Sequence, residues 1–225
     1  MLRWIASALD SSVGKKILMG LTGILLVLFL LEHLAGNLFL YVPGGEEAFG
    51  PFDAYVDFFP RFGPLLPVAE VALGLLFAVH ALYAIRITLA NREARPTKYV
   101  VRNDRGAKTI GSASMILTGL ALLAFLVVHL LDFRFDAGFH GDHGRTVAAK
   151  LARPGRALFY LAIMAVLGVH LSHGAQSALQ SLGIHHPRWT RFLRGLGIAV
   201  AVFFAVGFAS FPIYYLFFWT AGGAH

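Results

Sequence analysis

The chain has 225 residues, of which 57% are hydrophobic and only 14% are charged, with a formal net charge of +7 at pH 7. A soluble domain averages about 25% charged residues, so these values exclude a water-soluble globule and indicate a polytopic membrane protein, organised as a single domain over residues 1–225. The absence of cysteine excludes disulfides, iron–sulfur ligation and thiolate haem ligation. Any metal chemistry must therefore rest on the ten histidines and on carboxylates.

Five stretches are long enough to cross a membrane, which needs about 20 mainly apolar residues. They lie at about 17–41, 65–89, 109–133, 157–182 and 192–220. The first is not a secretory signal, because it is too long and contains Glu32 and His33 where such a signal is apolar. Pro212 in the last stretch predicts a kink rather than a helix end. The sequence thus predicts an all-α transmembrane bundle of five helices.

The basic residues indicate the orientation. The N-terminal segment and the second and fourth connections carry about twice as many Lys and Arg as the first and third connections. By the positive-inside rule we expect a cytoplasmic N-terminus and an outside C-terminus. The pI near 10 then reflects orientation among membrane lipids, and no nucleic-acid partner is needed to explain it.

Four histidines, His33, His80, His129 and His170, lie one on each of the first four predicted spans. A single one could be hydrogen-bonded across a helix interface, but intramembrane ionisable groups are costly and four together indicate a function. At about 1.5 Å per residue, His33 and His129 (the outer pair) fall in the outer half. His80 and His170 (the inner pair) fall near the midplane or just past it. Because two imidazoles from facing helices complete a six-coordinate haem iron, the pattern predicts two haem b groups between the first four helices, suited to electron transfer.

An internal repeat supports the outer pair. Residues 21–23 (Leu-Thr-Gly) followed by His33 recur as residues 117–119 followed by His129, with identical spacing and a glycine ten residues before each histidine. Thr-Gly is a common packing element in membrane helices, but the matched spacing to histidine favours a role at the outer haem. We expect the small residue to let a macrocycle or a neighbouring helix approach the backbone.

Other polar residues leave alternatives open. His173 follows His170 by three residues on nearly the same helix face and is an alternative ligand or a partner for a haem propionate. Arg86 is a second candidate for a propionate, although it could equally extend to lipid head groups. His140 and His143 could form a surface metal site or be solvated.

Three segments and the placing of the four histidines resemble a known family. The segments are residues 32–38 (EHLAGNL), 46–49 (EEAF) and 170–177 (HLSHGAQS). Together they are similar to the cytochrome b558 subunit of succinate dehydrogenase, the single-chain di-haem membrane anchor of succinate:quinone oxidoreductase, which is respiratory complex II. The resemblance covers nearly the whole chain, from Lys15 to the fifth span.

The resemblance implies roles for residues and for partners. His33 and His129 would bind the distal haem, and His80 and His170 the proximal one. A flavoprotein subunit with FAD would oxidise succinate in the tricarboxylic acid cycle, and an iron–sulfur subunit would pass the electrons through this anchor to a membrane quinone, which the resemblance indicates is menaquinone. The chain would therefore have no complete enzyme activity alone. It would lie in the bacterial cytoplasmic (inner) membrane.

Quinone reduction needs hydrogen-bond partners for two carbonyls and a route for protons. The sequence offers such groups near each haem and does not select between them, and the acidic stretch after the first span could also be a solvated loop. The candidates are Glu32, Glu47, Asp53, Tyr55 and Asp57 on the outer side, and Gln176 and Ser177 on the inner side.

Three other functions are weighed against this one. The first is a quinol:fumarate reductase anchor, which has the same architecture and the opposite direction of reaction. A cytochrome b of a hydrogenase or formate dehydrogenase ranks lower, because the repeat and the 46–49 segment are not expected there. A proton-coupled transporter with a histidine relay would predict inverted repeats and broken helices, whereas this repeat joins two helices of the same direction.

Overall fold

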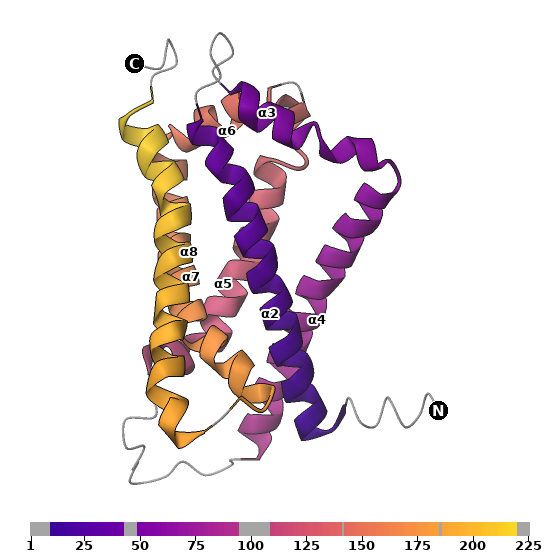
Figure 1. Ribbon diagram of the computed structural model, residues 1–225, viewed down its shortest axis with the longest axis vertical. Helices are drawn as coiled ribbons and strands as arrows, with labels where there is room; N and C mark the ends of the chain where they lie inside the picture. Colours follow the sequence, from indigo (N-terminus) through magenta and orange to yellow (C-terminus); the bar gives the residue numbers. More distant parts are fainter. Residues whose placement is uncertain (1–9, 43–48, 95–108, 141, 185, 220–225) are drawn as a thin grey trace.

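The computed structural model describes residues 10–42, 49–94, 109–140, 142–184 and 186–219, and the structural statements below concern these residues. Five helices in this part are long and apolar enough to cross a membrane, which confirms the five predicted spans. Their bounds are Ser12–Tyr41, Leu65–Glu93, Ile110–Asp132, Pro154–Ser181 and Pro187–Phe217. They run up and down in one bundle (Figure 1), and no strand occurs among the described residues.

The helices begin where the sequence supplies caps. The Ser11 side chain accepts a hydrogen bond from the Gly14 amide at the start of α2 (Ser12–Asn37), which continues into the 3₁₀ helix η1 (Leu38–Tyr41). Thr109 and Ser112 form a reciprocal capping box before α5 (Ile110–Asp132). Helix α4 spans Leu65–Glu93, and α7 (Pro154–Ser181) begins with a proline at its first turn.

Short helices cover one end of the bundle, which we call the capped end. They are α3 (Gly50–Val56), η2 (Phe59–Phe62), η3 (Ala137–His140) and α6 (His143–Leu151), and Figure 1 shows α3 and α6 there. The Gly144 amide donates to an Asp53 carboxylate oxygen at 2.8 Å, and His143 Nε2 lies 3.0 Å from Asp57 Oδ1. These contacts join α3 to α6. The topology expected from the basic residues would place the capped end outside the cell.

Helices α7 and α8 form the most extensive helix–helix contact among the described residues. Helix α8 (Thr190–Phe217) follows the 3₁₀ helix η4 (Pro187–Trp189). A Cβ on Gly168 would lie 3.1 Å from the Ala205 side chain, and one on Gly197 would lie 3.1 Å from the Ser172 carbonyl oxygen. Glycine favours such close approach of the helices, because a Cβ at either position would be closer than an ordinary van der Waals contact. As predicted, Pro212 does not end its helix, which continues to Phe217 with the proline fully buried.

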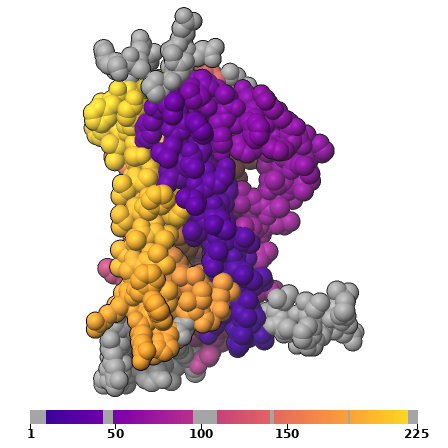
Figure 2. Space-filling view, in the orientation of Figure 1, coloured from indigo at the N-terminus to yellow at the C-terminus, as the bar shows by residue number. Residues whose placement is uncertain are grey.

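Helix α4 differs from the others because none of its residues is buried. Near the capped end it leans away from α2 (Figure 1), and the space-filling view shows an opening between the two helices (Figure 2). Its exposed side chains include Val68, Val71 and Leu75, each more than 60% exposed. Such an apolar face suits contact with lipid tails. The divergence of α4 leaves space inside the bundle.

Candidate functional site

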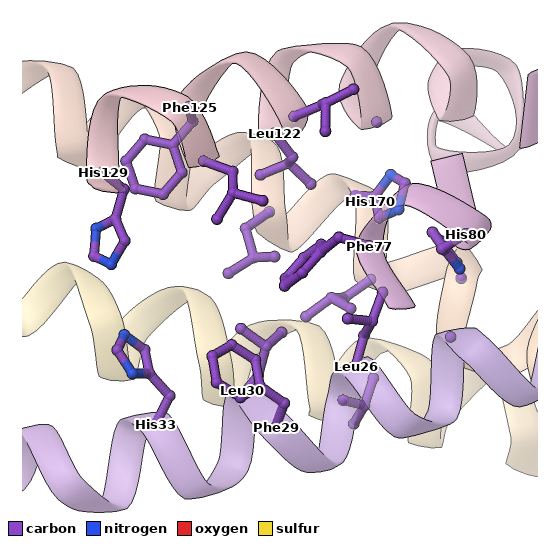
Figure 3. A pocket seen from close by; sticks show the side chains of 18 of the residues that line it. Leu26, Phe29, Leu30, His33, Phe77, His80, Leu122, Phe125, His129 and His170 are labelled. Carbon is purple, nitrogen blue, oxygen red and sulfur yellow. The ribbon is translucent and has the colours of Figure 1, made fainter. Parts of the chain in front are cut away.

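A cavity of about 1350 Å³ lies between α2, α4, α5 and α7, with α8 closing one side. Most of its lining is apolar, and all four intramembrane histidines contribute to it. Figure 3 shows the outer pair facing each other at one end and the inner pair at the other end, with Phe77 between them. Typical small-molecule pockets measure about 300–1,000 Å³, so this cavity has room for more than one ligand of ordinary size.

The outer pair has the spacing of two ligands to one metal. The ring centroids of His33 on α2 and His129 on α5 are 5.8 Å apart, with the rings at 86°. Metal–imidazole bonds are about 2.0–2.1 Å, so two imidazoles on opposite sides of one metal have centroids roughly 6 Å apart. Phe29 stacks on His33 at 5.4 Å, and Phe125 lies 5.5 Å from His129. These phenylalanines, one turn before each histidine, restrict the positions of the imidazoles.

The inner pair is held by threonines on neighbouring helices. Thr22 Oγ1 lies 3.0 Å from His80 Nδ1, and Thr118 Oγ1 lies 3.0 Å from His170 Nδ1. Each hydroxyl also donates to the carbonyl oxygen four residues earlier, at 2.8 Å and 3.0 Å respectively. With that hydrogen directed to the carbonyl, the threonine oxygen can accept the Nδ1 hydrogen of histidine. The tautomer with its hydrogen on Nδ1 leaves the Nε2 lone pair free to bind a metal.

The glycines of the repeat also serve the inner pair. A Cβ on Gly23 would lie 3.5 Å from His80 Cε1, and one on Gly119 would lie 3.4 Å from His170 Cε1. The spacing in the sequence links this repeat to the outer pair, and the contacts place its glycines beside the inner pair as well. Ten residues of helix separate each glycine from the outer histidine that follows it, which is about 15 Å along the axis. The Thr-Gly step thus lies at the level of the inner histidine on the adjacent helix.

Sequence reasoning did not identify the polar residues beside His129. Tyr160 Oη lies 3.5 Å from His129 Nδ1 and donates to Asp132 Oδ2 at 2.8 Å. Asp132 Oδ1 lies 3.2 Å from Nη2 of Arg156, and the Asp132 side chain is 7% exposed. A signal was present, because Asp132 follows His129 by one helical turn within the third span. Its partner Tyr160 lies on α7, and the sequence alone does not show that α5 and α7 are neighbours.

The residues present fit haem better than a bare metal ion. Among the described residues no group of three or more His, Cys, Asp or Glu side chains could hold an ion, whereas haem iron takes only axial ligands from the protein. The paired imidazoles would provide these ligands. Lys16 and Arg134 also line the cavity, towards its opposite ends, and either could bind a propionate carboxylate.

Two residues considered for the haem lie outside this lining. Arg86 is exposed, with its guanidinium 5.8 Å from the Tyr83 ring centroid. His173 packs against α5, because a Cβ added to Gly111 of that helix would lie 2.9 Å from the Cβ of His173. His170, by contrast, reaches the cavity. At the capped end His143 pairs with Asp57 rather than with further metal-ligating groups.

Glu32 and Tyr55 come together at the capped end of the cavity, and both line it. The Tyr55 hydroxyl donates to Glu32 Oε1 at 2.6 Å. Gly36 makes this possible, because any Cβ there would collide with the Tyr55 ring. Burial and the Glu32 carboxylate raise the pKa of Tyr55 above its ordinary value of 10.0. Nearby, Arg134 donates two hydrogen bonds to Glu70, at 2.8 and 3.0 Å, across the rim of the cavity.

The other quinone candidates are placed differently. Asp53 and Asp57 join α3 to α6, as described above, and are not part of the cavity lining. Burial raises the pKa of Asp53 above its ordinary value. Ser177 lines the cavity, whereas Gln176 packs against α8. Glu47 lies outside the described residues.

Comparison with known proteins does not identify a family: no family model, curated protein or solved structure matches the chain.

Proposed function

We propose that this chain is the membrane-anchor cytochrome b subunit of a succinate:quinone oxidoreductase, carrying electrons from an iron–sulfur subunit to a membrane quinone. The observation that carries the proposal is the apolar cavity with one histidine pair at each end, of which the outer pair has ring centroids 5.8 Å apart. When bound, a haem iron with two imidazole ligands supplies reversible one-electron transfer and has no open position for oxygen.

The chain's own residues prepare the cavity for such a group. Thr22 and Thr118 hold His80 and His170 in the tautomer that presents Nε2. The apolar lining keeps water away from the ligands, and this environment sets a metal's potential. The five spanning helices of the described residues are continuous, which argues against a proton-coupled transporter, because broken helices are expected there.

Glu32 and Tyr55 are the residues we propose for quinone chemistry. Each carbonyl of a quinone that accepts two electrons must also gain a proton. A tyrosine with an ordinary or a raised pKa is protonated near neutral pH, and the pKa of Tyr55 is raised. Its hydroxyl can therefore turn from Glu32 to donate to a quinone carbonyl. Glu32 lies next to His33 in the sequence and at the capped end of the bundle, where it can receive protons from that surface. We propose menaquinone as this quinone, as the resemblance implies.

The partners follow from what the chain lacks. Without cysteine it cannot hold iron–sulfur clusters, so we assign the clusters, and FAD with them, to other subunits. We propose that these dock at the end opposite the caps, which is expected to face the cytoplasm of a bacterial cell. Much of the basic second connection, residues 95–108, lies outside the described residues.

Purification of the tagged chain from membranes tests the proposal. We expect a flavoprotein and an iron–sulfur protein to co-purify, and the complex to reduce a soluble quinone analogue with succinate. Fumarate reduction by a quinol that is faster than succinate oxidation would instead assign the chain to a quinol:fumarate reductase. Co-purification of a hydrogenase or formate dehydrogenase, or of no redox partner, would refute the proposal.

A further inference from the structure

A hydrogen-bonded chain runs from the outer pair to the rim of the bundle. It begins at His129 Nδ1, 3.5 Å from Tyr160 Oη. Tyr160 donates to Asp132 at 2.8 Å, and Asp132 pairs with Arg156 at 3.2 Å. The carboxylate is nearly buried, at 7% side-chain exposure, and the guanidinium is partly exposed at 39%. A carboxylate inside a membrane bundle is costly unless it is paired and hydrogen-bonded, and here both conditions are met.

The direction of the hydrogen bonds follows from their chemistry. A phenol has a single hydrogen, and that of Tyr160 is directed to the carboxylate. The Tyr160 oxygen can therefore only accept from His129, whose Nδ1 must carry the hydrogen. At 3.5 Å this is a long hydrogen bond. His129 Nε2 is then left with its lone pair free, as a metal ligand requires.

The two pairs consequently differ in the group that accepts the hydrogen bond from histidine Nδ1. His80 and His170 donate to alcohols whose own hydrogens go to neutral backbone carbonyls. His129 donates to a phenol whose hydrogen goes to a carboxylate. A hydrogen bond backed by negative charge raises the electron density on the imidazole and makes it a stronger ligand, as carboxylate–histidine pairs do at other metal sites.

We propose that Asp132 and Tyr160 are positioning residues for the metal held by the outer pair: they fix the His129 tautomer and favour the oxidised state of that metal over the reduced state. The inference rests on the haem binding proposed above. It deepens that proposal by assigning to the outer pair an electronic control that the inner pair does not share.

Redox titration of the purified complex tests the inference, with the haem count and the electron paramagnetic resonance of the ferric state as further measurements. In Asp132→Asn and Tyr160→Phe we expect both haems to be retained and one midpoint potential to rise. A tenfold loss of preference for the ferric state corresponds to about 59 mV for one electron, and we expect a rise up to this size. The haem affected should be the one that is missing in His129→Ala.

Tyr41→Phe is the matched control, because its phenol also joins two helices, through Ser210 Oγ at 2.9 Å. We expect it to leave both potentials unchanged. If Asp132→Asn fails to assemble, Tyr160→Phe tests the same hydrogen bond while keeping the ion pair with Arg156. Unchanged potentials in a variant that retains both haems, or equal shifts of the two, would overturn the inference and leave the proposed function intact. A wild-type complex without haem would overturn both.

Discussion

Thr22 Oγ1 on α2 lies 3.0 Å from His80 Nδ1 on α4, and the same contact at the same distance joins α5 to α7. Each copy of the Leu-Thr-Gly motif thus places its threonine in contact with a histidine on the neighbouring helix. Each glycine that follows the threonine leaves room beside that histidine. Both histidines of the inner pair are therefore positioned by the same local arrangement of a threonine and a glycine.

Replacing either threonine tests the contact between threonine and histidine. In Thr22→Val or Thr118→Val the Nδ1 hydrogen of one inner histidine loses its acceptor, so we expect affinity for the inner haem to fall about 10–100-fold, as is typical for partners of metal ligands. Haem titration of the apo-protein measures the change. Thr88→Val is the control, because Thr88 also lines the cavity and donates to the carbonyl four residues earlier. Equal losses in Thr88→Val and Thr22→Val would contradict the assigned role.

Replacing the repeat glycines tests the space beside the inner pair. A Cβ on Gly23 would make only ordinary contact with His80, at 3.5 Å, so we expect Gly23→Ala to retain both haems. Gly23→Leu should lose the inner haem, because overpacking of this kind costs about 1–3 kcal/mol. The haem count per chain measures both effects. Gly195→Leu serves as control, since nothing lies within 4 Å of that position; loss of haem there as well would point to general misfolding.

Histidine variants test the pairing itself. His33→Ala and His129→Ala should each remove the same haem, because their rings face each other. His80→Ala and His170→Ala should each remove the other haem. Optical spectra at controlled potential distinguish the two species. We expect His173→Ala to retain both, since His173 lies outside the cavity lining; a common loss in His33→Ala and His80→Ala would show that the pairing is wrong.

Tyr55 variants test the proposed quinone site. Tyr55→Phe removes the hydrogen-bond donor next to Glu32, and we expect succinate-driven quinone reduction to slow by about 10²-fold, within the range for positioned proton donors. The haem count should not change. Tyr83→Phe, whose ring lies near Arg86 on α4, should keep the full rate. An unimpaired rate in Tyr55→Phe would favour the inner side, where Ser177 lines the cavity.

Local patterns in the sequence predicted some features and not others. The five spans follow from hydropathy alone, and counting residues along a helix predicted that His33 and His129 lie at the same level, as the 5.8 Å between their ring centroids shows. The role of Thr22 was missed because it depends on which helix is the neighbour. For the same reason Tyr160, 28 residues from Asp132, gave no signal.

Acidic residues at the capped end have a structural role that their residue types do not reveal. Asp53 and Asp57 have the residue types of a proton pathway, and in the structure both join α3 to α6. Composition cannot separate these roles, because a carboxylate that accepts an amide hydrogen bond and one that transfers protons look alike in a sequence. Haem and quinone binding remain predictions that the geometry supports.

The most direct test of the central claim is a reduced-minus-oxidised optical spectrum of the purified protein, with haem counted per chain. We predict two low-spin haem b groups per chain, one for each histidine pair. A protein that assembles in the membrane and contains no haem would contradict this claim.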